Sequence, residues 1–462
     1  MERTTAKKNK YEIDMCNGTI MDKLISFSLP LMLSGILQLM FNAVDIIVVG
    51  RFSGSQALAA VGSTSALINV FTNLFIGISL GANVLTARFY AAGREKEVSE
   101  TVHTAITLAL VSGIVMALVG LVFSKGALAL MGTPDDVIGL SALYMRIYFL
   151  GMPFFMLYNY GAAILRAVGD TKRPLLFLMI AGVINACLNM VLVIVFKLGV
   201  AGVAIATVIS QMISCVLVLR CLCRSESSYR LRFSELGMKG YYLKQIFSVG
   251  VPAGIQSTVI NFSNVLLQSS VNSFGSTAMA GYTAANNLLG FLYVSVNSIT
   301  QACMSFTSQN YGVGKLKRMD RVLADCMILS VVVAVVLGCI CYGFGPEILQ
   351  IYTEDAEVIA CGMEILAYTT ITYFLCGWMD LFPGALRGMG YSAVPMVLSV
   401  IGTVGTRVVW IFGIFPYHRS LAILFISYPA SWIITIVLQV ICFYFVRRRV
   451  HRGSQALAGQ EA

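Results

Sequence analysis

Four polar residues lie within apolar stretches of the sequence and have side chains that could bind an ion: Asp45, Asn185, Asn189 and Thr207. Asp45 lies inside the run NAVDIIVVG, with apolar residues on both sides. Asn185 and Asn189 are four positions apart, so their amides share one face of a helix. A carboxylate can carry a proton, and carboxylate, amide and hydroxyl oxygens are the ligands that hard cations such as Na⁺ prefer. We predict an ion-coupling site formed by these four residues.

Each of these residues also has a structural interpretation. Asp45 could belong to an ion pair or lie at the membrane interface, and the two asparagines could hold neighbouring helices together. Thr207 alone is weak evidence for a site. The high cost of a carboxylate in hydrocarbon favours a functional role for Asp45, which must face protein or a water-filled cavity.

A second group of uncharged polar residues could line a cavity for a bulky substrate. Asn261, Asn264 and Gln268 are spaced i, i+3 and i+7, which places them on one helical face. Contact between helices is an equal alternative for them. The candidate substrate residues are Asn42, Gln256, Asn261, Asn264 and Gln268.

Two prolines lie in corresponding helices, Pro30 in the first apolar run and Pro252 in the seventh. A proline inside a helix removes one backbone hydrogen bond and favours a kink, and neighbouring groups must satisfy the carbonyl that is freed. We predict that Pro30 is a gating element, because such a helix can exist in straight and bent forms.

Four further charged residues lie within apolar stretches: Arg146, Glu364, Asp380 and Arg407. Either arginine could pair with Glu364, and ion-pair scaffolding is the role that we expect for them. Asp380 and Arg387 lie near the inner end of the tenth stretch.

Signatures of an enzyme are missing from the sequence. There is no Walker A motif, no H-E-x-x-H motif and no G-x-S-x-G motif. The chain has three histidines, and its twelve cysteines lack metal-site spacing. We expect neither an enzyme nor a bound cofactor, so any transport must draw on an ion gradient.

The composition is that of an integral membrane protein. Of the 462 residues, 58% are hydrophobic and 12% are charged, about half the charged share of a soluble domain. A helix needs about 20 apolar residues to cross the hydrocarbon core, and the sequence offers twelve such stretches. They are 24–49, 57–84, 101–123, 138–161, 174–196, 200–222, 245–271, 277–303, 322–345, 358–384, 391–413 and 420–446.

The sequence is an internal repeat. GSQALAA at 54–60 returns as GSTAMAG at 275–281, an offset of 221 residues that other motifs share. Each copy holds six apolar stretches, an even number, so both copies enter the membrane in the same orientation. We therefore predict an all-α membrane protein whose two six-helix lobes are related by a pseudo-two-fold axis along the membrane normal, the architecture of secondary transporters. The expected parts are a tail (1–23), an N-lobe (24–222), a linker (223–244), a C-lobe (245–446) and a basic tail (447–462).

The two copies of the repeat differ in the polar residues at equivalent positions. The positions equivalent to Asp45, Asn185, Asn189 and Thr207 are Leu267, Thr406, Trp410 and Tyr428. A packing role shared by both copies would more often be kept in both. A set of ligands kept in one copy indicates a single ion site, located in the N-lobe.

Several motifs together give the chain a resemblance to the multidrug and toxic compound extrusion family. They are Pro30 followed by VDIIVVG (44–50), LAAVG (58–62), GVAGVAIAT (199–207) and ALRG (385–388). The resemblance covers nearly the whole chain and implies a Na⁺- or H⁺-driven exporter of organic cations and related amphipathic compounds.

The resemblance also implies roles for particular residues. Asp45 matches the family's essential first-helix aspartate, Asn185 and Asn189 match a polar pair of the fifth helix, and Thr207 matches a hydroxyl position of the sixth. Some members carry an acid in the seventh helix, but Ser257–Gln268 has none here. This departure puts a cation site in the C-lobe in doubt.

Other functional classes stay open. A flippase for lipid-linked precursors would belong to the same superfamily, but it would need several cationic residues facing its cavity. An intramembrane enzyme would need paired carboxylates or a nucleophile with a base, and neither is evident. We expect small organic cations and membrane lipid as partners, no nucleic acid, and a monomer.

The distribution of Lys and Arg predicts the orientation. With the N-terminus inside, the cytoplasmic side holds 26 of the 32 basic residues, the outside holds four, and two lie within spans. Cytoplasmic loops carry such an excess. We therefore expect a protein of the cell membrane with both termini in the cytoplasm.

The orientation can be tested with topology reporters fused to single loops. Reporters at Thr133 and Glu354 should report the exterior, and a reporter at Ser227 should report the cytoplasm. Alkaline phosphatase and fluorescent-protein activities measure the two locations. The opposite pattern would overturn both the topology and the transport mechanism built on it.

Overall fold

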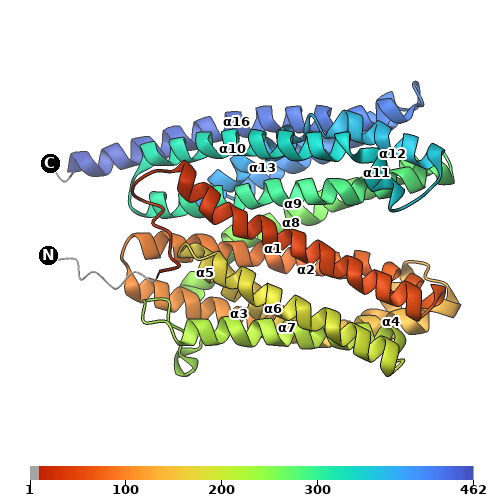
Figure 1. The fold of residues 1–462 in the computed structure, drawn as a ribbon. Helices are drawn as coiled ribbons and strands as arrows, with labels where there is room; N and C mark the ends of the chain where they lie inside the picture. Colours follow the sequence, from red (N-terminus) through yellow and green to blue (C-terminus); the bar gives the residue numbers. More distant parts are fainter. Residues whose placement is uncertain (1–9, 461–462) are drawn as a thin grey trace. The chain divides into compact units, whose positions relative to one another are not determined.

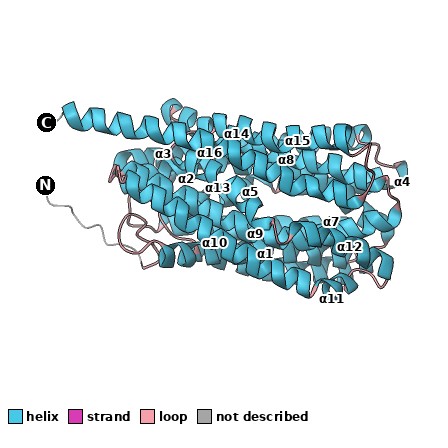
Figure 2. Cartoon of the chain, turned by 90° about the horizontal axis from the view of Figure 1, so that it is seen from above, coloured by secondary structure: helices cyan, strands magenta, loops and turns pink. Residues whose placement is uncertain are grey.

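The computed structural model describes residues 10–460, and this part of the chain contains helices and loops but no strand (Figure 2). The first half contains α1 (Met21–Phe52), α2 (Ser55–Ala91), α3 (Glu95–Leu130), α4 (Asp135–Leu150), α5 (Met152–Ala167), α6 (Lys172–Asn189), η1 (Met190–Val195) and α7 (Gly199–Cys223). A short 3₁₀ turn, η2 (Phe233–Glu235), follows in the linker.

The second half follows a similar order, with the short helix α11 added and with its fifth stretch divided into four segments (Figure 1). It contains α8 (Gly240–Asn272), α9 (Ser276–Gly312), α10 (Leu316–Gly343), α11 (Gly345–Gln350), α12 (Ala356–Thr369), α13 (Tyr373–Gly388), α14 (Ala393–Ser399), η3 (Val400–Gly405), α15 (Thr406–Val409), η4 (Trp410–Ile414) and α16 (Leu421–Gln460). Every stretch expected to span the membrane coincides with one of these helices or with several consecutive helical segments.

Apolarity varies between the helices. Within the described residues, eight are long and apolar enough to cross a membrane, and two bent pairs raise the number to ten. The bends are 47° between α4 and α5 and 51° between α12 and α13. Helices α8 and α9, of 33 and 37 residues, are as long as α1 and α2 but carry more polar side chains. The candidate substrate residues of the second half all lie on α8.

The chain divides into two compact units. Within the described residues, one contains residues 10–14 and 33–254, and the other contains residues 15–32 and 255–460. This division differs from the lobe boundaries expected from the sequence, because the linker belongs to the first unit and the boundaries fall inside α1 and α8. Each boundary comes two residues after a proline, Pro30 in α1 and Pro252 in α8.

Each unit is a bundle with its own core. In the first unit, α5 packs against α2, α3 and α7, and α6 packs on α7 (Figure 1). In the second unit, α13 packs against α9, α10 and α16. Helices that are distant in sequence pack together in each bundle. Residues of α1, α6 and α7 can therefore meet in the first unit.

A crossing of small residues joins α2 to the first part of α8 within the first unit. A Cβ atom added to Gly81 would overlap the carbonyl oxygen of Ile246, and one added to Gly77 would overlap the backbone of Gly254. A Cβ atom at Gly250 would lie 2.5 Å from the Cα atom of Ile78. Such small-xxx-small spacings allow close contact between membrane helices.

This crossing predicts that Gly81→Ala destabilises the protein. A methyl group there meets backbone and not a mobile side chain, so we expect a loss of about 1–3 kcal/mol and a lower Tm in a thermal-shift measurement. The control is Gly62→Ala on the same helix, where an added Cβ meets nothing within 4 Å and the change should stay within about 1 kcal/mol. Equal Tm values for the two variants would contradict the close crossing.

Candidate functional site

The four residues predicted to form an ion site come together in the first unit. Asn189 of α6 donates from Nδ2 to Oδ1 of Asp45 on α1, and the same nitrogen donates to Oδ1 of Asn185, 3.1 Å away. Thr207 of α7 donates its hydroxyl to the carbonyl of Val203 at 3.0 Å, and this hydroxyl also lies beside the Asp45 carboxylate. Three helices thus supply four oxygen-bearing side chains to one place.

A glycine on α6 allows α1 to approach the site. A Cβ atom at Gly182 would overlap the ring of Phe41, which belongs to α1. Gly182 lies three residues before Asn185, and Phe41 lies four residues before Asp45, so each pair shares a helical face. The contact between Phe41 and Gly182 and the hydrogen bond between Asp45 and Asn189 therefore lie along the same faces of α1 and α6.

The two amide side chains are buried, and one amide oxygen has no hydrogen-bond partner in the described part of the chain. Asn189 is fully buried and Asn185 is 5% exposed. Both hydrogen bonds of Asn189 leave from its nitrogen, and its buried Oδ1 has no hydrogen-bond partner. A buried acceptor without a donor is costly. This oxygen, next to a carboxylate, can be satisfied by a bound cation.

The backbone changes its winding at this point. The π-helical segment η1 begins directly after Asn189, and η4 begins at Trp410, the residue equivalent to Asn189 by the 221-residue offset. Single π-helical turns within α-helices are frequent at functional sites. The wider turn occurs in both copies, although only the first copy has the acid and the two amides.

Two tyrosines of α4 were not predicted as site residues. Tyr144 and Tyr148 lie close enough to Asp45 to interact with it electrostatically. Their rings stack with centroids 6.2 Å apart. They are four residues apart within a predicted span, which places both on one helical face. This spacing is the sequence feature that could have identified them.

Three of the candidate substrate residues on α8 have side-chain hydrogen-bond partners. Gln256 accepts a hydrogen bond from Arg387 at 2.6 Å, and Asn264 accepts one from Arg407 at 2.7 Å. Gln268 donates to Asn272 at 3.1 Å. The other two, Asn42 and Asn261, have exposed side chains.

The expected pairing of Glu364 with an arginine is wrong for the described residues. No ion pair in residues 10–460 includes Glu364, Arg146 or Arg407. Arg407 is bound by neutral groups instead, and Asp380 interacts electrostatically with Arg387, seven residues away on α13.

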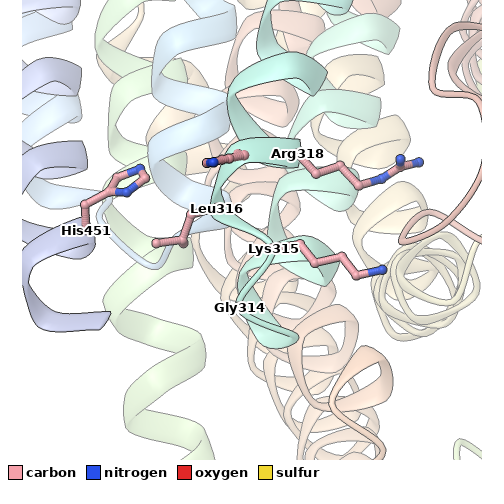
Figure 3. A pocket seen from close by; sticks show the side chains of 6 residues that line it. Gly314, Lys315, Leu316, Arg318 and His451 are labelled. Carbon is pink, nitrogen blue, oxygen red and sulfur yellow. The ribbon is translucent and has the colours of Figure 1, made fainter. Parts of the chain in front are cut away.

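A shallow hollow in the second unit is lined by several cationic residues (Figure 3). Lys315 and Arg318 extend away from His451 there and hold the N-terminal segment. Lys315 donates to the carbonyl of Cys16 at 2.8 Å, and Arg318 donates to that of Met15 at 3.2 Å. These cations therefore fasten a piece of chain, and we assign no ligand to the hollow.

A family model gives the decisive comparison. The MatE model matches this chain twice, over residues 30–191 and 252–412. The chain belongs to the MatE family. The two matches start 222 residues apart and end 221 residues apart, so they reproduce the internal repeat found in the sequence.

Relatives of the whole chain agree with this assignment. The chain is 32% identical over 434 residues to the "Probable multidrug resistance protein YoeA" of Bacillus subtilis, covering 92% of this chain and 93% of that one. It is 22% identical to the "Multidrug export protein MepA" of Staphylococcus aureus, over 82% and 84% of the two chains. A solved structure described as the outward-facing conformation of a multidrug resistance MATE family transporter matches with a TM-score of 0.87 at 19% identity, covering 97% and 100%.

These comparisons confirm the main conclusions from the sequence. The protein is an all-α, multi-pass membrane protein with twelve membrane helices in two six-helix lobes. It is a transporter of the multidrug efflux family, and it is not an enzyme.

The site predicts that Asp45→Asn leaves a folded protein that no longer exports substrate against its gradient. The amide keeps the size of the carboxylate, but it can neither ionise nor neutralise a cation. Export of a fluorescent organic cation from proteoliposomes measures the loss, and size-exclusion chromatography checks the fold.

A matched control is Glu364→Gln, which makes the same change of acid to amide in another membrane helix. The Glu364 side chain makes no hydrogen bond or ion pair in the described residues. We expect it to export normally. Normal coupled export by the Asp45→Asn variant would show that Asp45 is structural.

Proposed function

We propose that this protein is a secondary active antiporter that exports cationic, amphipathic organic compounds in exchange for Na⁺ or H⁺. The ion enters the first unit and binds at Asp45, Asn185, Asn189 and Thr207. The substrate leaves in the opposite direction. No cofactor takes part.

One observation carries this proposal: a carboxylate within a membrane helix is bound by an amide whose own oxygen has no partner. Within residues 10–460 no group of three or more His, Cys, Asp and Glu side chains could hold a metal ion, so the set is not of the kind that binds zinc. Carboxylate, amide and hydroxyl oxygens suit a hard monovalent cation or a proton.

Ion binding can drive transport because it changes the charge of the site. A proton on Asp45, or Na⁺ held by Asp45 and the oxygen of Asn189, neutralises the carboxylate. Neutralisation removes the charge that orients the Asn189 amide and lets α1, α6 and α7 repack. A bound ion shifts such an equilibrium only by its difference in affinity for the two states, so the packing with Asp45 neutral must expel a cationic substrate.

Pro30 is the proposed gating residue. It lies inside the continuous helix α1, where it supplies no N–H to the helix. The division of α1 between the two units falls two residues later. A bend at this point would move the part of α1 that carries Asp45 independently of the part before the proline.

The proposal includes a location and an orientation. The excess of Lys and Arg in alternate loops supports both termini in the cytoplasm, and the membrane is then the cell membrane. The basic run that follows the apolar part of α16, residues 447–449, suits contact with anionic lipid headgroups. We propose that the protein works as a monomer.

The experiment that tests the exchange is efflux from proteoliposomes under separately imposed gradients of Na⁺ and pH. Purified protein is reconstituted with a fluorescent organic cation, and its movement is recorded with one gradient at a time. Movement against the dye gradient under either ion supports the antiporter. Movement only down the dye gradient, under both conditions, would overturn it.

The site makes a prediction about which ion is used. If Na⁺ drives export, Asn189→Ala removes one oxygen ligand, and the apparent affinity for Na⁺ should fall about tenfold or more, by analogy with the cost of one hydrogen bond to a charged group. The Na⁺ dependence of transport rate measures this in wild type and variant. An unchanged Na⁺ affinity would contradict the sodium site, and export driven by pH alone would make Asp45 the proton carrier.

A further inference from the structure

The second unit contains a buried cation that the proposed antiport mechanism does not use. Arg407 lies on α15, the short helix between the π-helical segments η3 and η4, and is 3% exposed. Arginine stays charged in proteins. A full positive charge is therefore held inside this unit.

The contacts of Arg407 in the described residues are all neutral. Its Nη1 donates to the hydroxyl of Ser263 at 3.1 Å and to Oδ1 of Asn264 at 2.7 Å, both on α8. The guanidinium carbon lies 4.7 Å from the centroid of the Tyr428 ring on α16. These contacts fix the position of the guanidinium but do not balance its charge.

The other elements around Arg407 place no acid in an ion pair with it in the described residues. Asp380, an acid of α13, interacts electrostatically with Arg387, Tyr373 and Cys376 instead. The groups close enough to interact with it electrostatically are Tyr282 of α9, Tyr373 and Cys376 of α13, and Tyr428. The hydroxyls of Tyr282 and Tyr428 bond to each other at 2.9 Å. The hydroxyl of Tyr373 donates to a backbone carbonyl at 3.3 Å.

One edge of the guanidinium makes no hydrogen bond in the described residues. Both hydrogen bonds leave from Nη1, and the buried Nε has no partner. Nε and Nη2 form one of the two parallel-donor edges with which arginine holds a carboxylate. A buried charge that lacks both a counter-charge and full hydrogen bonding is strongly unfavourable.

The repeat makes the arrangement more specific. Arg407 follows Thr406, the residue equivalent to Asn185, and Tyr428 is equivalent to Thr207. In the first unit α6 and α7, together with α1, surround an anionic side chain with neutral groups. In the second unit the corresponding helices surround a cationic side chain, so the sign of the charge is reversed.

We propose that the Nε and Nη2 edge of Arg407 binds a small monovalent anionic group, either free chloride or the carboxylate of a transported compound. The anion completes the hydrogen bonding of the fork and balances its charge. Ser263 and Asn264 both bond to Nη1, which leaves Nε and Nη2 as the donors for the anion. The proposal does not depend on the coupling ion of the first unit.

The test measures anion binding to the full-length protein in detergent, with radiolabelled chloride and radiolabelled benzoate as separate probes. Wild type should bind at least one of them saturably. Arg407→Gln should weaken that binding about ten- to a hundredfold, since a hydrogen-bonded charge is removed. The matched control is Arg146→Gln, which removes an exposed arginine from α4 and should bind as wild type does.

The two probes distinguish the source of the anion. Saturable binding of chloride that depends on Arg407 supports a free anion, and binding of benzoate without chloride supports a carboxylate group of the substrate. Binding of neither probe to wild type overturns the proposal. Equal binding by wild type and Arg407→Gln overturns it as well.

Diffraction provides a measurement that needs no variant, should Arg407→Gln fail to fold. Crystals of the wild-type protein grown in bromide locate the anion by its anomalous signal. A peak at the guanidinium of Arg407 supports a halide site. If bromide binds in solution but its peaks lie only elsewhere on the protein, the site is wrong.

Discussion

An ionised side chain inside a membrane must be surrounded by polar groups from its own protein, because hydrocarbon offers it none. This constraint organises both units. Asp45 requires the amide of Asn189, and so α6 must lie against α1, which only a glycine opposite Phe41 allows. Arg407 requires α8 and α16 in the same way. In each unit helices thus pack around a charge within the membrane, an anionic one at Asp45 and a cationic one at Arg407, and these two charges differ in sign between the two copies of one fold.

The π-helical segments indicate how each site is tuned. A wider turn shifts the direction of the side chains that follow it, without breaking the helix. Such a turn begins next to Asn189 in the first unit, and two turns flank the helix of Arg407 in the second. The membrane forbids unpaired backbone groups that face lipid, so a change of winding is a permitted way to aim a polar side chain.

The sequence predicted the membrane helices, the repeat and the grouping of Asp45 with Asn185, Asn189 and Thr207, because apolar runs, constant offsets and i, i+4 spacing are local features. It did not predict which polar residues of α8 meet an arginine, since this depends on how distant helices cross. The expected pairing of Glu364 failed for that reason. The open edge of Arg407 could not be foreseen either, because a single arginine in an apolar run does not reveal its partners.

The division of α1 between the two units has a consequence for biosynthesis. Residues 15–32 are synthesised before residues 33–254, yet the unit to which they belong is otherwise built from residue 255 onward. The beginning of α8 joins the earlier unit in the same way. Neither unit can therefore be completed from one half of the chain alone. The first part of α1 therefore gains the contacts of its own unit only after the residues from 255 onward have been synthesised.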